Sequence, residues 1–228
     1  MKTRIISILT LMAAVFTLSS CSDDSTDGLT RITYYAILEL NGDEAMTVPV
    51  GTTFNDPGCK ALMKGEDVSD QVIVTGTVDT NTPDFYTIDY LVVNKDGFKA
   101  STSRTVAVVD PNNFASPYFS ACQYGSRQYS NLPVKITDNG DGTYTIDDLA
   151  GGFYVYGRYP GYPYDFSYEA KLKLNADNTV SLVEEGDGSE WYWEIPLTIT
   201  SGKYDAANGK IELLINFDGD PLTVTLTK

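Results

Sequence analysis

The chain has 228 residues with 16 Lys and Arg against 31 Asp and Glu, and its formal net charge is −15. Nucleic acids and anionic lipids require a basic face, so we expect neither as a partner. The same acidity would also serve solubility alone. The sequence contains no histidine, which argues against His-dependent nucleophilic catalysis and against His-ligated metal sites.

Residues 1–20 have the layout of a secretory signal peptide. Lys2 and Arg4 precede an apolar stretch over residues 5–18, and two serines follow it. The stretch is too short and too close to a cleavage site to be kept as a membrane span. Cleavage before Cys21 removes two basic residues and no acidic ones, leaving 14 basic against 31 acidic residues and a net charge of −17.

The end of this segment, residues 18–21 (Leu-Ser-Ser-Cys), resembles the lipobox of bacterial lipoproteins. The resemblance implies that Cys21 is lipidated and becomes the first mature residue. The acidic residues that follow, Asp23 and Asp24, resemble the signal that exports Bacteroidetes lipoproteins to the outside of the outer membrane. Several acyl chains, at about 0.8 kcal/mol per buried CH₂, suffice for stable anchoring. We therefore expect a lipid-anchored protein of the outer membrane that faces the extracellular side.

Residues 21–30 are polar and lack periodicity, which predicts a flexible tether. Helical patterning is nearly absent beyond it, and short β-rich runs alternate with turns, as is typical of an all-β sandwich or barrel. About seven such runs in residues 31–110 suggest an immunoglobulin-like (Ig-like) β-sandwich. The clearest predicted strands of this domain lie at residues 32–40, 47–50, 72–74, 86–93 and 100–109.

Four segments of this domain carry a family resemblance, namely residues 50–61, 74–80, 82–90 and 104–106. They are similar to the bacterial Ig-like family that also occurs in pesticidal crystal proteins and in many surface proteins. Asp84 and Phe85 stand where that family usually has Gly, and Phe98 stands where it usually has Asn. The resemblance implies a spacer or adhesion module without catalytic residues.

Residues 110–113 (Asp-Pro-Asn-Asn) break regular structure and mark a domain boundary. Residues 111–228 are again β-rich, and three hairpins are predicted around turns at residues 138–142, 175–178 and 218–221. Consecutive hairpins form an antiparallel meander, so we expect a small barrel or sandwich. The whole chain resembles Bacteroidetes surface lipoproteins of unknown function, which are often encoded beside polysaccharide-uptake systems.

The second domain has a high density of aromatic residues between Phe153 and Tyr168 and again at residues 191–193. From Tyr162 to Tyr168 every second residue is aromatic, which in a strand places four rings on one face. Two tryptophans would share a face in the same way, with Tyr192 opposite. Flat rings suit stacking on sugars, and exposed aromatic patches also mark protein interfaces. The candidate ligand-binding residues are Tyr154, Tyr156, Tyr159, Tyr162, Tyr164, Trp191 and Trp193.

The alternative interpretation is that these rings form the core of the domain, because a small β domain needs large side chains there. Residues 158–164 contain two prolines and one glycine, so we expect this loop to lie outside regular strand pairing and to be exposed. The solvent exposure of the aromatic residues decides between a binding surface and a core.

Catalytic residues, metal sites and cofactors are not expected. Residues 138–142 lack the calcium-binding pattern, since Gly occupies its third and fifth positions and Leu149 its twelfth. The acidic run at residues 184–190 is typical of a solvated loop rather than of a glycosidase pair. Neither a phosphate-binding loop nor a nucleophile elbow occurs. Cys59 and Cys122 are expected to be two buried thiols rather than a disulfide.

These observations predict a non-enzymatic surface lipoprotein. The Ig-like domain would be a spacer, and the second domain would bind extracellular carbohydrate. The alternative is a cell-adhesion or assembly protein that binds a protein partner through the same aromatic patch. The expected partners are the outer membrane through the lipid anchor, a glycan, and other surface proteins of a polysaccharide-uptake system.

Overall fold

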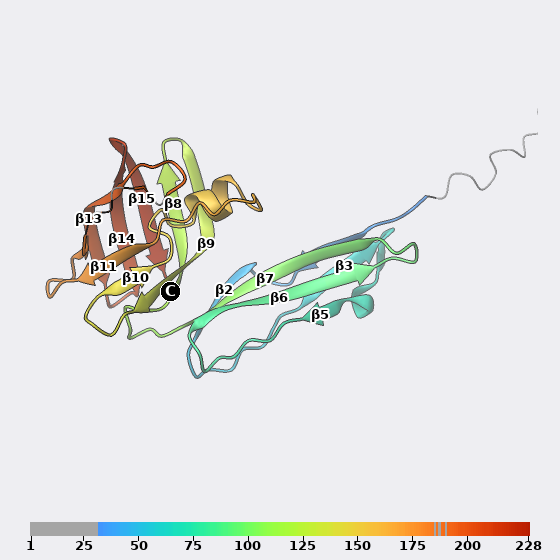
Figure 1. The fold of residues 1–228 in the computed structure, drawn as a ribbon. Helices are drawn as coiled ribbons and strands as arrows, with labels where there is room; N and C mark the ends of the chain where they lie inside the picture. The colour runs from blue at the N-terminus through green and yellow to red at the C-terminus, as the bar shows by residue number, and fades with distance from the viewer. Residues whose placement is uncertain (1–31, 185, 187, 190) are drawn as a thin grey trace, which may run out of the picture. The chain divides into compact units, whose positions relative to one another are not determined.

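A computed structural model describes residues 32–184, 186, 188–189 and 191–228. The predicted signal peptide, the lipidation site Cys21 and the tether over residues 21–30 lie outside the described residues. The chain is nearly all-β, as predicted, with a sandwich of sheets followed by a nearly closed, eight-stranded antiparallel sheet (Figure 1). The sequence left a barrel and a sandwich open for the second part, and the structure shows a barrel-like sheet.

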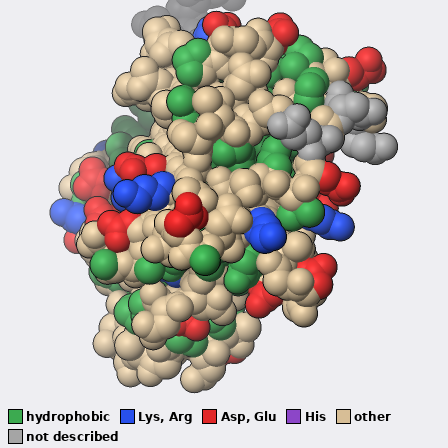
Figure 2. Space-filling model, turned by 90° about the vertical axis from the view of Figure 1, so that its left-hand side faces the viewer, with side chains coloured by type: hydrophobic (Ala, Val, Ile, Leu, Met, Phe, Trp, Pro, Cys, Tyr) green, Lys and Arg blue, Asp and Glu red, His purple; other side chains and the backbone are tan. Residues whose placement is uncertain are grey.

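The surface carries the acidic character of the sequence. On the face drawn in Figure 2, red acidic side chains are more frequent than blue basic ones, and hydrophobic side chains occur in small, separate groups. The excess of 31 acidic over 16 basic residues in the whole chain has the same sign. Such a surface favours solubility and disfavours association with polyanions.

The first seven strands form two sheets. The smaller sheet contains, in spatial order, β1 (Ala36–Leu40), β3 (Cys59–Met63) and β4 (Glu66–Asp67). The larger sheet contains, in spatial order, β2 (Ala45–Pro49), β7 (Lys99–Val109), β6 (Asp84–Val93) and β5 (Ile73–Thr75). β2 runs parallel to β7, and the other pairs are antiparallel.

All five strands predicted for this part are present, although β1 begins only at Ala36. The prediction missed β3, which directly follows the Asp-Pro-Gly breaker at residues 56–58, and the two-residue β4. Along β6, Ile88, Tyr90 and Val92 are buried, and they alternate with residues that face outward. This two-residue period is what a sheet with one buried face requires.

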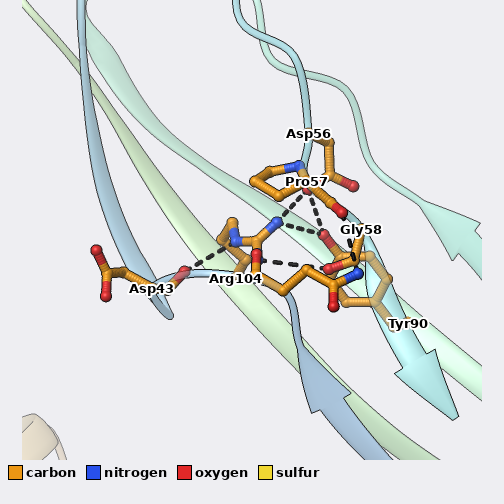
Figure 3. Close-up of polar contacts among 7 residues, drawn as sticks. Asp43, Asp56, Pro57, Gly58, Tyr90 and Arg104 are labelled. Carbon is orange, nitrogen blue, oxygen red and sulfur yellow. Dashed lines mark hydrogen bonds and ion pairs between the residues drawn. The ribbon is translucent and has the colours of Figure 1, made fainter.

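A fully buried arginine joins the loops and strands of this sandwich (Figure 3). On β7, the Nε of Arg104 donates to the carbonyl of Asp43 (2.9 Å), and Nη2 donates to the carbonyl of Asn41 (2.6 Å). Nη1 forms an ion pair with Asp56 and donates to the hydroxyl of Tyr90 (3.0 Å). The Tyr90 hydroxyl in turn donates to the same Asp56 carboxylate (2.6 Å). The guanidinium charge is therefore paired and hydrogen-bonded, as a buried charge must be.

The last eight strands form one antiparallel sheet. In chain order they are β8 (Pro117–Tyr124), β9 (Arg127–Asp138), β10 (Tyr144–Ile146), β11 (Ala170–Leu174), β12 (Val180–Leu182), β13 (Leu197–Asp205), β14 (Lys210–Phe217) and β15 (Asp220–Thr227). Their spatial order is β12-β11-β10-β9-β8-β15-β14-β13. A bridge between Thr179 and Lys203 links the two edges of the sheet, which makes it nearly closed.

The three predicted hairpins are confirmed as β9–β10, β11–β12 and β14–β15. Two further hairpins, β8–β9 and β13–β14, were not predicted.

Residues of the barrel strands alternate between the interior and the surface of the barrel. On β14, Ile211, Leu213 and Ile215 are buried and Glu212 is exposed between them.

The strands of the barrel differ in length. β9 has twelve residues, whereas β10 and β12 have three each. Two segments outside the strands lie where these strands are short, namely residues 147–169 and the described part of residues 183–196. Their residues Leu149, Phe153 and Trp191 join the barrel core. The first segment contains a π-helical turn, Phe153–Arg158 (η3, gold in Figure 1). The only other helical turn in the described chain is a 3₁₀ turn at Ser69–Gln71 (η2).

The chain enters and leaves the barrel at one end. Phe114, just before β8, contacts the rings of Tyr144 (4.7 Å) and Tyr204 (5.1 Å). The Lys228 ammonium lies 5.2 Å from the ring centre of Tyr118 and donates to the carbonyl of Asp110 (3.0 Å). Among the described residues, no helix is long and apolar enough to cross a membrane.

Replacing Asp56 tests the buried arginine network. Asp56→Ala leaves the Arg104 charge buried without its partner, which costs about 3 kcal/mol or more. The control Asp89→Ala removes an exposed carboxylate on β6 of the same sandwich and is expected to cost less than about 0.5 kcal/mol. Urea unfolding followed by far-UV circular dichroism measures both values. Equal effects of the two substitutions would contradict a structural role for the network.

Candidate functional site

The segment with most of the aromatic residues is closed at its base by Asp148. This carboxylate is 3% exposed. One of its oxygens accepts the backbone N–H groups of Ala150 (2.9 Å) and Tyr168 (3.1 Å), and the other accepts that of Gly152 (2.9 Å). The N–H of Leu149 also donates to the carbonyl of Tyr168 (2.7 Å). Because these partners lie at opposite ends of the segment, both ends are held together.

Two glycines start the π-helical turn against the barrel wall. Gly151 and Gly152 have φ angles of +69° and +76°. A Cβ atom on Gly151 would lie 2.7 Å from the hydroxyl of Ser120, and one on Gly152 would lie 2.9 Å from the Cβ of Leu132. Both the backbone angle and the space therefore require glycine. The turn continues with a hydrogen bond from the N–H of Gly157 to the carbonyl of Gly152 (3.2 Å).

Burial raises the pKa of Asp148 to about 7, although its backbone N–H donors oppose the shift. The charge of Asp147 next to it acts in the same direction as burial. The pKa of Asp147 is also raised, mainly by burial. The base of the aromatic segment therefore holds an acid that titrates near neutral pH.

Five aromatic side chains of the two segments are buried in the core, and they are Phe153, Tyr154, Phe166, Tyr168 and Trp191. The indole N–H of Trp191 donates to the carbonyl of Phe166 (2.9 Å), which joins the two segments. Phe153 contacts Tyr124, the last residue of β8 (6.0 Å), so this cluster lies at the barrel end opposite the one where the chain enters.

Two of the predicted ligand-binding residues are therefore core residues. Tyr154 is 7% exposed and Trp191 is 4% exposed, too little for either ring face to stack on a ligand. These two rings are buried because the strands β10–β12 are short, and large side chains must fill the space that these strands leave in the barrel wall. For these two residues the core interpretation is correct.

Three tyrosines are exposed and contact one another, and we call them the tyrosine cluster: Tyr162, Tyr164 and Tyr192. Their exposed fractions are 56%, 59% and 56%. The ring centres of Tyr162 and Tyr164 lie 5.9 Å apart, and those of Tyr164 and Tyr192 lie 5.8 Å apart. Tyr156 is also exposed, on the π-helical turn.

Two half-buried rings connect the tyrosine cluster to the core. Trp193 stacks on Phe166 (5.2 Å, 29°) and lies 4.3 Å from the ring of Tyr154. Tyr159 lies 5.9 Å from Tyr162 and 6.5 Å from Trp193. The exposed tyrosines therefore rest on a continuous layer of rings, which restricts their motion.

The predicted strand geometry of residues 162–168 is wrong. These residues form no strand, because Pro163 has no N–H for a ladder and a turn precedes it, in which the N–H of Tyr162 donates to the carbonyl of Tyr159 and Gly161 has a φ of +73°. Tyr162 and Tyr164 are exposed, whereas the other two alternating rings, Phe166 and Tyr168, are buried. The expected exposure of the loop at residues 158–164 is confirmed for most of its length, since only Tyr159 is half-buried.

The predicted geometry of residues 191–193 is also wrong. They form a turn in which the N–H of Glu194 donates to the carbonyl of Trp191 (2.9 Å). Trp191 and Trp193 contact each other at 4.7 Å, as rings on one face would. Tyr192, however, does not point away from them, and its ring lies 5.1 Å from that of Trp193.

The sequence interpretation missed Tyr192 as a site residue and Asp148 as the group that holds the site. An alternation rule for strands assigned Tyr192 to the wrong face. The signal for Asp148 was present in the run Asp-Leu-Ala-Gly-Gly at residues 148–152, since Asp followed by small residues and glycines favours a tight, side-chain-capped turn.

A polar pocket of about 510 Å³ lies between the two aromatic segments. Its volume is in the usual range of small-molecule sites. The lining residues are Asp165, Ser167, Tyr168, Glu169, Gly186, Gly188, Ser189 and Trp191. Carboxylates and hydroxyls thus face the space beside the buried rings.

The described residues contain no group of three or more His, Cys, Asp or Glu side chains that could hold a metal ion. Cys59 and Cys122 are free thiols, as predicted, with Cys122 buried and Cys59 half-buried. Burial raises the pKa of both thiols. Three carboxylates of the acidic run, at positions 185, 187 and 190, lie outside the described residues.

Comparison with protein families gives two matches. A model of the Ig-like domain of bacterial surface proteins matches residues 38–108. A second model, described as a "-like, C-terminal domain", matches residues 108–228, just over half of the chain. Neither match is to an enzyme family. No curated protein matches the chain.

Among solved structures, the lipoprotein BT2262 from Bacteroides thetaiotaomicron is 29% identical, with a TM-score of 0.56. The alignment covers 85% of this chain and all of that one. The predicted resemblance to Bacteroidetes surface lipoproteins with an Ig-like domain is thereby confirmed.

Two structures of Clostridium perfringens ZmpB are more distant. One, of CBM51-2 in complex with GlcNAc and of INT domains, is 13% identical over 85% of this chain and 43% of that one. The other, of the M60 catalytic domain with CBM51-1 and CBM51-2, is 10% identical over 86% and 21%. Both have a TM-score of 0.30, so neither supports a functional argument.

Substitution at Trp191 and Tyr192 separates core rings from surface rings. Trp191→Ala empties a buried site and loses the bond to Phe166, so we expect a loss of about 3–5 kcal/mol in the free energy of unfolding. Tyr192→Ala removes an exposed ring and is expected to cost less than about 1 kcal/mol. Urea unfolding followed by circular dichroism gives both values, and a larger loss for Tyr192→Ala would contradict this assignment.

The Asp148 carboxyl predicts a pH dependence of stability. Its pKa is raised from 3.8 to about 7 by folding, so the folded chain binds this proton more tightly than the unfolded chain does. The contribution of this group to the free energy of unfolding therefore falls as the pH rises from about 4 to about 7. Asp148→Asn removes this titration. The stability advantage of the wild type over this variant should therefore shrink as the pH rises across this range.

Urea unfolding at a series of pH values measures this difference, and Glu212→Gln on the exposed face of β14 is the control. The control should follow the wild-type profile. A wild-type advantage over Asp148→Asn that stays constant or grows with pH would contradict the raised pKa.

Proposed function

The chain belongs to the family defined by the C-terminal domain matched over residues 108–228, and we propose that it is a non-catalytic surface lipoprotein that binds extracellular carbohydrate through this domain. The similarity to the lipoprotein BT2262 and the Ig-like domain typical of bacterial surface proteins support the surface location. We take residues 31–110 as the Ig-like domain and residues 111–228 as the binding domain.

The tyrosine cluster is the single observation that carries this proposal. Three contiguous rings are more than half exposed, whereas most of the other aromatic residues that the structure describes are buried or half-buried. They lie at the barrel end away from the point where the chain enters, so a ligand reaches them without displacing the connection to the rest of the chain. Exposed apolar patches of this kind mark binding sites.

The chemistry of the rings suits a sugar. A tyrosine offers a flat apolar face for the C–H groups of a pyranose and a hydroxyl for hydrogen bonding. Tyr159 and Trp193 support the cluster from below, so little side-chain entropy is lost when a ligand binds. Tyr156, on the neighbouring turn, would extend the contact surface.

The anchor completes the proposal. Lipidation of Cys21 would attach the chain to the outer membrane, residues 21–30 would act as a tether, and the Ig-like domain would be the spacer. The protein would face the extracellular side, where other surface proteins of a polysaccharide-uptake system would be its neighbours. The absence of a match to an enzyme family agrees with a binding role.

The second candidate function is adhesion or assembly through a protein partner bound to the same tyrosines. Tyrosine is enriched at protein interfaces for the reasons that suit it to sugars. The polar pocket beside the cluster favours the carbohydrate, since a protein partner fits a flatter patch.

Isothermal titration of the chain against a panel of glycans tests the proposed function. The substitutions Tyr162→Ala, Tyr164→Ala and Tyr192→Ala should each weaken binding of a positive glycan by about tenfold, because each removes one stacking face. Tyr35→Ala, an exposed tyrosine outside the binding domain, is the matched control and should bind normally. Absence of binding across the panel would overturn the carbohydrate function and favour a protein partner.

A further inference from the structure

We infer that the ligand of the tyrosine cluster is an uncharged or amine-bearing glycan, and that the polar pocket between the two aromatic segments is the subsite that selects it. This inference rests on the proposed function and specifies its substrate class. It is carried by the position of the pocket beside the cluster and by the charge of the groups that line it.

The pocket adjoins the tyrosine cluster through the chain itself. Its described lining forms two walls, one from residues 165–169 and the other from residues 186, 188, 189 and 191. Tyr164 comes directly before the first wall and Tyr192 directly after the second, and their rings lie 5.8 Å apart. The two walls therefore meet at a pair of exposed rings. A sugar stacked on this pair has its substituents within reach of the pocket.

The lining of the pocket offers hydrogen-bond acceptors. Asp165 and Glu169 bring two exposed carboxylates, and Ser167 brings a hydroxyl. Asp165 is held in place because one of its oxygens accepts the N–H of Ser167 (2.9 Å). An ionised carboxylate only accepts hydrogen bonds, and it accepts those of hydroxyl or ammonium donors strongly. Sugar hydroxyls and protonated amino groups are such donors.

The back of the pocket is rigid. Trp191 and Tyr168 line it, and their rings meet edge to face at 5.3 Å. Both are buried, and Trp191 is fixed by its bond to the carbonyl of Phe166. The N–H of Tyr168 is held by Asp148. The shape of the pocket therefore does not have to form when a ligand arrives, and this lowers the cost of binding.

The charge of the pocket disfavours anionic sugars. None of its described lining residues is Lys or Arg. The basic residue of the aromatic segment, Arg158, lies over the ring of Tyr159 (5.1 Å) rather than in the pocket lining. A uronate or sulfate placed beside Asp165 and Glu169 would meet like charges without a compensating cation, which opposes binding. The net charge of the whole chain adds a repulsive field of the same sign.

Matched glycans test this selectivity on the full mature chain. The first pair is methyl-esterified and de-esterified homogalacturonan. The second pair is neutral galactan and sulfated galactan. Partly deacetylated chitin oligosaccharides, which carry amines, are compared with heparin, which is anionic. We expect binding only to the uncharged or amine-bearing members. Binding that is equal or stronger for the de-esterified or sulfated members overturns the inference and leaves the proposed carbohydrate function standing.

A double variant tests the pocket itself. Asp165→Asn with Glu169→Gln removes two charges, while the amide oxygen of Asn still accepts the N–H of Ser167. We expect at least a fivefold loss of affinity for the preferred glycan. The ratio of its affinity to that of its anionic counterpart should also become smaller than in the wild type. The control, Asp89→Asn with Glu212→Gln, makes the same change in net charge at exposed positions elsewhere, and should bind as the wild type does.

The possible outcomes separate the two proposals. If the double variant binds as well as wild type while Tyr164→Ala does not bind, the pocket is not the subsite and the inference fails alone. If no glycan of either kind binds, the proposed function fails and the inference with it. High salt should reduce the exclusion of anionic glycans, because exposed charges are screened.

Discussion

The candidate site depends on one buried carboxylate. Asp148 accepts backbone N–H groups from both ends of the segment at residues 149–168. A loop of this length would otherwise lose its order, because fixing each residue costs about 1–2 kcal/mol of conformational entropy. The strands β10 and β12 are too short to complete the wall. The anchored segment and the turn at Trp191 fill that gap with rings instead.

This arrangement explains why one aromatic cluster serves two purposes. Its inner members, such as Phe153 and Trp191, are core residues of the barrel, and its outer members, such as Tyr164 and Tyr192, are exposed. The outer rings are held by the inner ones through Trp193 and Phe166. Rigidity of the binding surface is therefore a consequence of the packing that stabilises the fold. The buried Arg104 network plays the corresponding structural role in the Ig-like sandwich.

Much of the fold was predictable because its signals are local. Alternation of apolar residues along β6 and β14, and turn residues between paired runs, identify strands and hairpins. The site was predicted only in part. Alternation between Tyr162 and Tyr168 imitates a strand, but Pro163 prevents pairing and tertiary packing then decides which rings are buried. The run at residues 148–152 signals the tight turn that Asp148 caps, but the bond to Tyr168, 20 positions away, depends on tertiary packing that this run does not reveal.

The central claim is that the tyrosine cluster is the surface that contacts a carbohydrate. A titration followed by NMR, with the tyrosine rings isotopically labelled and assigned by single substitutions, measures this contact most directly. Addition of a glycan found to bind should shift the ring signals of Tyr162, Tyr164 and Tyr192 and leave that of the distant, buried Tyr118 unchanged. Shifts confined to other tyrosines, with these three unaffected at saturation, would contradict the account.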